Sequence, residues 1–374
     1  DEMAAHGLVG GYAMNPLEYP PLGFVWLWLS ATLADVAGVH AFYGIKTGLL
    51  LFLLATTVIL YRQAGRDAGS IFFYYVALLL SALALSYLDI YLAPFLLLAF
   101  AAWRRERWQT GLLLFAIAVL TKYSAIIMAP FVLLYFLSMQ RQRSAALLPV
   151  ALQAVWPSLL LVMALLLVFG REPLDALGRA FGHSDLSANA LNFNWVQTRL
   201  IQLWLSGRDL LQAYNMDSQL LRNPPLWAIA LARALFGVFY LLALAMFWRR
   251  QRGFEDFLLF SLLGHLAYFM FNIGVHENHL FLSMLLVMAL AHANPAYRLL
   301  AINVCLISSL NLFAFHSYNG NLPDLWRGVA VSGWEGANAW MNGGPPFDFR
   351  LLLAFVNVLF FFSLWFAVWR QGKS

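Results

Sequence analysis

The sequence predicts an all-α protein that crosses a membrane many times, and three observations lead to this prediction. Hydrophobic residues make up 62% of the 374 residues, whereas charged residues make up only 11%. Long apolar runs recur along the whole chain, and lysines and arginines cluster in the short stretches between them. A helix satisfies its own backbone hydrogen bonds within lipid, so apolar runs of about 20 residues predict membrane-spanning helices.

Comparison of the apolar runs with a span of about 20 residues predicts about eleven transmembrane helices in a single domain, 1–374. The predicted spans are 42–61, 68–86, 90–103, 108–121, 124–138, 145–169, 226–248, 257–274, 280–293, 299–315 and 351–369. Segments 108–121 and 124–138 are too short to cross a full bilayer core at about 1.5 Å per residue. We therefore expect their junction at Lys122 to lie within the outer half of the membrane.

Basic residues predict the orientation of these helices, because cytoplasmic loops carry an excess of lysine and arginine. The arginine clusters all fall on one side only if the apolar run 22–39 does not cross the membrane. We therefore predict that 22–39 is an interfacial or re-entrant helix, with Trp26 and Trp28 at headgroup depth and Asp35 on its polar side. The pI near 9.3 follows from these clusters and does not indicate a nucleic-acid partner.

Most acidic residues fall on the predicted outer side of the membrane. That side holds three long segments: 1–41, which includes the interfacial helix, 170–225 and 316–350. Of the 18 carboxylates, those clearly on the cytoplasmic side are Asp67, Glu106, Glu255 and Asp256. We therefore expect an integral membrane protein of the cell inner membrane, or its equivalent, whose polar chemistry faces the periplasm, exterior or lumen.

The chain begins with an acidic pair, Asp1 and Glu2, and reaches its first apolar run through Glu18-Tyr19-Pro20-Pro21-Leu22. A carboxylate in an outer loop can serve as a general base on a hydroxyl group or as a metal ligand. A solvated chain terminus is the alternative interpretation. Each proline fixes its own φ and favours an extended residue before it, which suits the wall of a cleft or a simple stop before a helix.

Two further charges lie at short outer junctions between apolar runs. The turn that carries Asp89 is too short to lift the carboxylate far into water, so a functional role is favoured over a merely solvated one. Lys122 would attract a phosphate group as a compact point charge. Snorkelling of its ammonium group to the membrane interface is the alternative for this lysine.

The stretch His276-Glu277-Asn278-His279 is the densest polar cluster at any predicted helix junction. Its side chains could bind a metal, hydrogen-bond a phosphate or relay a proton, and the i, i+3 spacing of the two histidines suits one helical face. Contact with a phosphate or an acceptor is favoured over zinc, and helix capping is the weaker alternative.

Amides and an aromatic ring stand together in the long outer segment, at Asn192, Asn194 and Trp195. Sugar recognition uses such groups, because amides give directional hydrogen bonds to hydroxyls and rings give stacking faces. The aromatic side chains could equally place this loop at the membrane interface. His265, within an apolar run, is expected to form an interhelical hydrogen bond.

Together these pieces resemble the GT-C superfamily of multi-spanning glycosyltransferases, which use polyprenyl-phosphate sugars. Asp1 with Glu2 is similar to the acidic motif of that family's first outer loop, and Asp89 to its second acidic position. The stretch around Tyr19 resembles its Tyr-Pro-Pro-Leu motif. Lys122 resembles a lysine of the mannosyltransferase branch, and the stretch 276–279 a His-Glu motif of dolichyl-phosphate-sugar users. The chain departs from the family in having no acidic-x-acidic pair near Asp89 and no large C-terminal soluble domain.

The resemblance implies transfer of a hexose, with mannose favoured, from a polyprenyl-phosphate donor to a hydroxyl of a lipid, glycan or protein. It implies Asp1 as the general base, and Lys122 with the 276–279 cluster as stabilisers of the leaving phosphate. Asn192, Asn194 and Trp195 would hold the sugar or the acceptor. It implies no certain cofactor and leaves a divalent cation open. It also implies a twelfth helix before Asp1, which fits a chain that does not begin with Met.

The alternative prediction is a secondary transporter or a flippase for lipid-linked glycans. Lys46, His265 and the two short helices would then form a broken-helix path for the substrate. Transporters tend to show paired repeats and charges near the midplane, and this sequence has little of either, so the transferase is favoured.

Overall fold

The computed structural model is helical and divides into two units, which are described separately. It describes residues 2–14, 18–63, 68–142, 147–182, 184–205, 218–250, 253–318 and 349–371. Unit 1 comprises Asp1–Gly182, Gln251–Leu258 and Leu285–Leu300, and unit 2 comprises His183–Arg250, Leu259–Met284 and Ala301–Ser374. The described residues form no strand, as the predicted all-α class requires.

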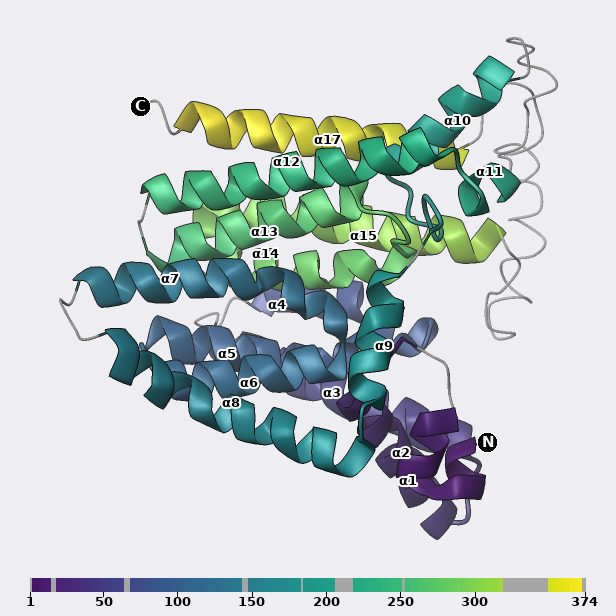
Figure 1. Ribbon diagram of the computed structural model, residues 1–374, viewed down its shortest axis with the longest axis vertical. Coiled ribbons are helices and arrows are strands. Elements are labelled where there is room, and N and C mark those ends of the chain that lie inside the picture. The colour runs from purple at the N-terminus through teal and green to yellow at the C-terminus, as the bar shows by residue number, and fades with distance from the viewer. Residues whose placement is uncertain are drawn as a thin grey trace. The chain divides into compact units, whose positions relative to one another are not determined.

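The first helices all belong to unit 1 (Figure 1). They are α1 (Glu2–Met14), α2 (Pro21–Val36), α3 (Ala41–Gln63), α4 (Ala68–Leu79), α5 (Ala93–Arg104), α6 (Trp108–Thr121), α7 (Ala129–Gln142), α8 (Leu147–Phe169) and α9 (Glu172–Phe181). A π-helical turn, η1 (Leu80–Ala84), continues α4. The 3-10 turns η2 (Leu88–Leu92) and η3 (Tyr123–Met128) lead into α5 and α7.

Unit 2 contains the helices α10 (Phe193–Leu205), α11 (Ser218–Arg222), α12 (Leu226–Arg250) and α17 (Phe349–Gln371). Three helices contribute residues to both units: α13 (Phe254–Phe271), α14 (Phe281–Ala293) and α15 (Arg298–Tyr318). The 3-10 turns η4 (Glu277–Leu280) and η5 (Pro295–Tyr297) precede α14 and α15. Most of the predicted segment 316–350 lies outside the described residues.

Seven helices among the described residues are long and apolar enough to cross a membrane. They are Ala41–Gln63, Tyr123–Arg141, Leu147–Phe169, Leu226–Arg250, Phe254–Phe271, Pro295–Phe313 and Arg350–Gln371. The predicted number of about eleven is therefore not confirmed, because the runs 68–86, 90–103, 108–121 and 280–293 form shorter helices. The predicted shortness of 124–138 is wrong, because η3 and α7 continue as one run of 19 residues.

The N-terminal stretch, expected to be a polar loop, instead forms α1. Its two helical pieces meet at Gly7, whose φ of 70° lies in the region that favours glycine. Further along, the ring of Tyr12 packs edge-on against Phe24 of α2 and Phe169 of α8, with centroids 5.0 and 5.1 Å apart. These buried aromatic contacts explain why a Gly-rich stretch becomes a docked helix.

Helix α2 packs closely against α3 through two glycines one turn apart. A Cβ atom at Gly44 would lie 2.3 Å from the Ser30 carbonyl oxygen, and one at Gly48 would lie 2.3 Å from the Ser30 Oγ. Small residues at such spacing let two helix backbones approach one another within a membrane. The predicted interfacial run is therefore a short helix of 16 residues that is held directly beside α3.

The contacts within unit 1 agree with the predicted alternation of charge. Arg62 at the end of α3, Arg104 at the end of α5 and His292 at the end of α14 line one cavity. Asp89 precedes α5 and meets Lys122 instead. The cavity with Arg104 and the Asp89–Lys122 pair thus lie at opposite ends of α5, whose 12 residues span about 18 Å. Which end faces the cytoplasm stays a prediction.

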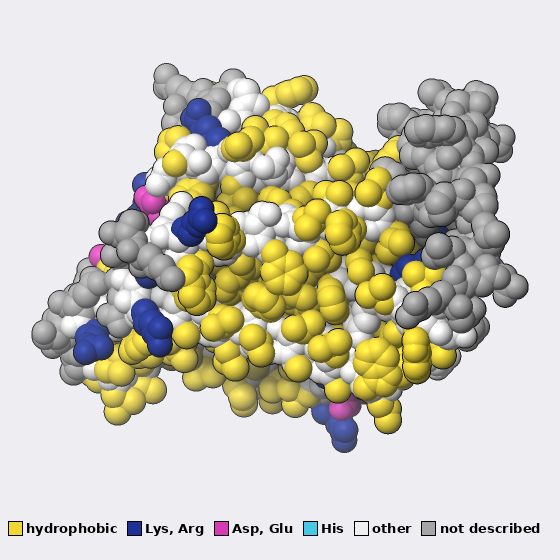
Figure 2. Space-filling model, turned by 90° about the horizontal axis from the view of Figure 1, so that it is seen from above, with side chains coloured by type: hydrophobic (Ala, Val, Ile, Leu, Met, Phe, Trp, Pro, Cys, Tyr) yellow, Lys and Arg dark blue, Asp and Glu magenta, His cyan; other side chains and the backbone are white. Residues whose placement is uncertain are grey.

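Unit 2 packs around aromatic side chains and exposes others. Phe239 of α12 stacks on Phe271 of α13 at 5.1 Å and meets Phe361 of α17 edge-on at 5.2 Å. Figure 2 shows the face on which α12 and α17 lie, and hydrophobic side chains cover much of it. Leu241 of α12 is 64% exposed. Such an apolar surface suits lipid, and together with the seven long apolar helices it identifies an integral membrane protein.

The α2–α3 contact predicts that Gly44→Ala lowers the melting temperature by several degrees, because overpacking costs about 1–3 kcal/mol. Gly237→Ala in α12 is the matched control, since nothing lies within 4 Å of its added Cβ. Thermal unfolding in detergent, followed by tryptophan fluorescence, measures both variants. Equal melting temperatures for the two variants would contradict the close α2–α3 contact.

Candidate functional site

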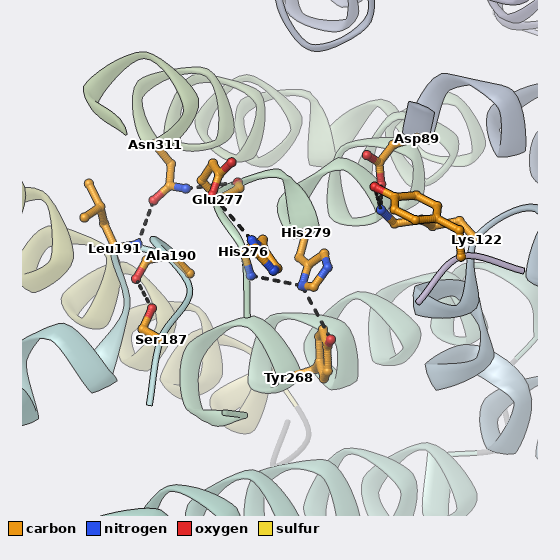
Figure 3. A network of polar contacts seen from close by, with 11 residues as sticks. Asp89, Lys122, Ser187, Ala190, Leu191, Tyr268, His276, Glu277, His279 and Asn311 are labelled. Carbon is orange, nitrogen blue, oxygen red and sulfur yellow. Dashed lines mark hydrogen bonds and ion pairs between the residues drawn. The ribbon is translucent and has the colours of Figure 1, made fainter. Parts of the chain in front are cut away.

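Three residues from separate parts of the sequence meet in unit 1. The Lys122 Nζ lies 3.7 Å from the Asp89 Oδ1 and donates a 3.2 Å hydrogen bond to the Tyr19 hydroxyl. The same Nζ lies 4.3 Å from the centroid of the Tyr19 ring. Figure 3 shows the Asp89–Lys122 pair. We call these three residues the Lys122 cluster, and all three were predicted site residues.

Local backbone geometry brings these side chains to one point. Tyr19 stands outside α2, because Pro20 is extended (φ −71°, ψ 159°) where that helix begins. Lys122 is also extended (φ −151°, ψ 118°) at the end of α6. Ser86, with φ 61°, turns the chain after η1, so that Asp89 enters the 3-10 turn η2. The cluster is therefore built from three helix junctions.

Both charges of the cluster are largely removed from water. The Asp89 side chain is 2% exposed and the Lys122 side chain is 12% exposed. An enclosed ion is costly unless a partner of opposite charge offsets the lost hydration. Their separation of 3.7 Å makes this an ion pair rather than a hydrogen bond. Asp89 thus holds a charged ammonium group in place beside a tyrosine hydroxyl, an arrangement that suits an anionic ligand group.

Neighbouring side chains hold Tyr19 and Thr121, the residue before Lys122. The Tyr12 hydroxyl donates to the Tyr19 carbonyl oxygen at 3.0 Å. Burial raises the pKa of Tyr12 to about 12, so this hydroxyl keeps its proton at neutral pH. The Trp26 Nε1 donates to the Thr121 Oγ1 at 3.3 Å, and the Trp26 ring stacks on Phe95. Tyr12 was not among the predicted site residues, because its Gly-rich surroundings resemble a loop.

An apolar groove of about 380 Å³ lies between α2 and α3 in the same unit. Its lining includes Trp26, Leu29, Leu33, Tyr43, Leu51 and Phe52. Leu33 and Tyr43 are both more than half exposed, so the groove opens to the surroundings of the protein. Because Trp26 also bonds Thr121, the groove begins beside the residue that precedes Lys122.

In unit 2, the polar stretch 276–279 forms a tight turn rather than one helical face. His276 is the N-cap of η4, and the two histidines form a capping box at its N-terminus. Their rings meet edge-on with centroids 5.6 Å apart. Helix capping, predicted as the weaker alternative, is therefore a role that both histidines have. The Tyr268 hydroxyl also lies 3.5 Å from the His279 Nδ1 (Figure 3).

Exposure differs sharply between neighbouring members of this stretch. The Glu277 side chain is 4% exposed, whereas His276 is 45% exposed, and the His276 Nδ1 lies 4.0 Å from the Glu277 Oε2. Asn278 is also buried. Hence His276 is the member of the stretch that a ligand could reach most readily.

An asparagine of α15 ties this turn to the segment before α10. The Asn311 Nδ2 donates to the Glu277 carbonyl oxygen at 3.0 Å, and its Oδ1 accepts from the Leu191 N–H at 2.9 Å. The Ala188 N–H also donates to the Val275 carbonyl oxygen at 3.0 Å. Asn311 was not among the predicted residues, although an asparagine within an apolar run signals an interhelical partner.

The predicted sugar-binding group is enclosed in unit 2. Residues 193–205 form α10, a short helix within the predicted long outer segment 170–225. Asn192 and Asn194 are fully buried, and their amides donate to the Phe269 and Leu186 carbonyl oxygens at 2.7 and 2.8 Å. Trp195 is 4% exposed and carries the Arg350 guanidinium 5.1 Å from its ring centroid. These three side chains hold the fold of unit 2 together, and sugar binding by them stays a prediction.

Two further polar groups lie within apolar helices. The His265 Nδ1 lies 2.8 Å from the Ser283 Oγ of α14, which confirms the predicted interhelical hydrogen bond. The Lys46 ammonium donates to the Leu83 carbonyl oxygen in the π-helical turn η1. Both groups thus have a partner inside the protein.

Asp1, the predicted general base, lies outside the described residues. Glu2 begins α1, and its side chain is likewise outside the described part. Among the side chains that the structure describes, no group of three or more His, Cys, Asp or Glu residues could hold a metal ion.

Comparison of the chain with models of protein families and with curated proteins finds no match.

The ion pair predicts that Asp89→Asn destabilises the protein by about 3 kcal/mol, because Lys122 would be left enclosed without a counter-ion. Lys122→Met should destabilise by a similar amount. Because the two substitutions remove the same interaction, the double variant should be less destabilised than the sum of the two single variants. Unfolding in mixed micelles measures this coupling, and strict additivity would show that the two side chains do not interact.

Proposed function

We propose that the chain transfers a hexose, with mannose favoured, from a polyprenyl-phosphate donor to an acceptor hydroxyl at the non-cytoplasmic face. The meeting of Tyr19, Asp89 and Lys122 is the observation that carries this proposal. The resemblance to the GT-C glycosyltransferases had selected these residues one by one. Their contact in the fold supports a common role for the three.

In the proposed reaction, the acceptor oxygen attacks the anomeric carbon of the sugar, and the bond from that carbon to the phosphate oxygen breaks. The electron pair leaves with polyprenyl phosphate, while a carboxylate accepts the hydroxyl proton. Lys122 stabilises the charge that develops on the phosphate, and a cation held in place by the protein does so without reorganisation. Asp89 and Tyr19 position the ammonium group. The resemblance assigns the base to Asp1.

The groove between α2 and α3 supports a polyprenyl donor. An apolar channel that starts beside the residue before Lys122 suits an isoprenoid chain whose phosphate contacts the ammonium group. The acceptor in this proposal is the hydroxyl of a lipid, glycan or protein, and a divalent cation is not assigned a place. The role of the 276–279 stretch in phosphate contact stays a prediction.

The proposal predicts that Lys122→Met and Asp89→Asn lower transfer by about 100-fold, because each removes or misplaces the charge opposite the leaving phosphate. The assay uses purified protein in lipid vesicles, a radiolabelled polyprenyl-phosphate mannose and a membrane extract as the source of acceptors. It follows the release of polyprenyl phosphate and the labelled product.

Two variants serve as matched controls in this assay. Asp35→Asn changes an exposed carboxylate of α2, and Lys46→Met removes a half-buried lysine that contacts the Leu83 carbonyl oxygen. Both should retain transfer close to the wild-type rate. Wild-type activity in folded Lys122→Met protein would refute the proposed role, and full activity in Asp1→Asn protein would remove Asp1 from the mechanism.

A transporter or flippase is the second candidate, favoured by the contact of Lys46 with the π-helical turn η1. Interrupted membrane helices line the substrate paths of many transporters, and Lys46 contacts such an interruption at Leu83. The same vesicles distinguish the two functions. A flippase would move the intact labelled lipid across the bilayer, without release of polyprenyl phosphate and with dependence on Lys46.

A further inference from the structure

A second cavity of unit 1, of about 360 Å³, lies where α3, α5 and α14 end and α13 begins. Its cationic lining consists of Arg62, Arg104 and Arg105, and all three side chains are exposed. Its apolar lining includes Phe100 and Ala289, and both are buried. The cavity thus combines an accessible cationic part with an enclosed apolar part.

The three guanidinium groups have no hydrogen bond or ion pair with any residue that the structure describes. Two acidic residues directly follow lining residues in the sequence: Glu106 follows Arg105, and Glu255 follows Phe254. The Glu255 Oε2 accepts a 2.9 Å hydrogen bond from the Asn294 Nδ2. Three like charges around one cavity repel one another unless an anion joins them. An anion bound between them would offset this repulsion.

His292 adds to the same lining. Its Nδ1 lies 2.8 Å from the Met288 carbonyl oxygen, and its Nε2 lies 3.1 Å from the Leu60 carbonyl oxygen. A carbonyl oxygen accepts hydrogen bonds only, and a neutral imidazole can donate one. Both ring nitrogens thus face carbonyl oxygens, which hold the ring in place within the lining.

We infer that this cavity, the arginine pocket, binds a phosphate monoester group. Guanidinium groups bind phosphate through paired N–H donors in a fixed fork, and several of them around one centre match the oxygens of a dianion. The buried apolar lining gives room for the carbon atoms next to such a group. The phosphate belongs either to the head group of an anionic lipid or to a soluble phosphate ester.

The arginine pocket is a separate site from the Lys122 cluster. Asp89 precedes α5, whereas Arg104 ends it, so the two sites lie about 18 Å apart along that helix. The inference therefore does not depend on the proposed sugar transfer. A protein without transferase activity could still bind phosphate here.

The test measures binding of short-chain phosphatidic acid to the full chain in detergent, with phosphatidylcholine of the same acyl length as the reference lipid. The pocket variant carries Arg62→Gln and Arg104→Gln. The control variant carries Arg141→Gln and Arg249→Gln, which remove the same charge from exposed arginines outside the pocket. Low ionic strength is used, because salt screens exposed charges.

Wild-type protein should bind phosphatidic acid at least about tenfold more tightly than phosphatidylcholine. The pocket variant should lose about tenfold in affinity, or about 1.4 kcal/mol, and the control variant less than twofold. Displacement of the lipid by millimolar inorganic phosphate would identify a soluble phosphate ester as the ligand class, and its failure would identify the lipid head group. Equal affinity of wild-type and pocket variant, or an equal loss in the control variant, would overturn the inference.

A measurement on the unaltered protein provides independent evidence. Phenylglyoxal modifies accessible arginines, and mass spectrometry of peptides locates the products. Bound phosphatidic acid or phosphate should protect Arg104 and Arg105 but leave Arg141 reactive. Equal modification with and without these ligands would contradict a phosphate site in the arginine pocket.

Discussion

A polar side chain that apolar helices enclose is costly unless a partner within the protein offsets its lost hydration, and such pairings join separate helices in both units. In unit 1, Lys122 meets the buried Asp89. In unit 2, His265 of α13 meets Ser283 of α14, and Asn311 joins two backbone segments at once. Lipid offers no hydrogen bonds to such groups, so each pairing ties particular helices together and limits how they can pack.

In unit 1 such pairings involve α2. Gly44 and Gly48 allow α2 to lie against α3, and Trp26 then reaches Thr121 at the end of α6. The next residue is Lys122, whose ammonium group bonds the tyrosine that precedes α2. A short apolar helix thereby links an apolar groove to an enclosed cation. This link supports the proposed ligand, which has an isoprenoid chain and a phosphate.

The sequence predicted the helical class, because crossing lipid requires long apolar helices, and such runs can be recognised without knowing the tertiary contacts. It also selected Tyr19, Asp89 and Lys122, because prolines and charges beside apolar runs are rare and visible. It did not predict α1 or α10, since Tyr12 and Trp195 are buried by tertiary contacts that a polar local sequence conceals. The predicted bounds of 108–121 match α6, whereas the runs 68–86 and 90–103 differ from the observed helices, because the π-helical turn η1 and the 3-10 turn η2 interrupt stretches of uniform hydropathy.

The central claim is that Lys122 contacts the phosphate of a polyprenyl lipid. The most direct measurement is the affinity of a short-chain polyprenyl phosphate for the protein in nanodiscs, with Arg62→Gln and Arg104→Gln present throughout to remove the arginine pocket. We predict that Lys122→Met weakens this affinity about tenfold, whereas Lys46→Met leaves it unchanged, as expected for loss of one enclosed charge contact. Equal affinity with and without the Lys122 ammonium group, in folded protein, would contradict the claim.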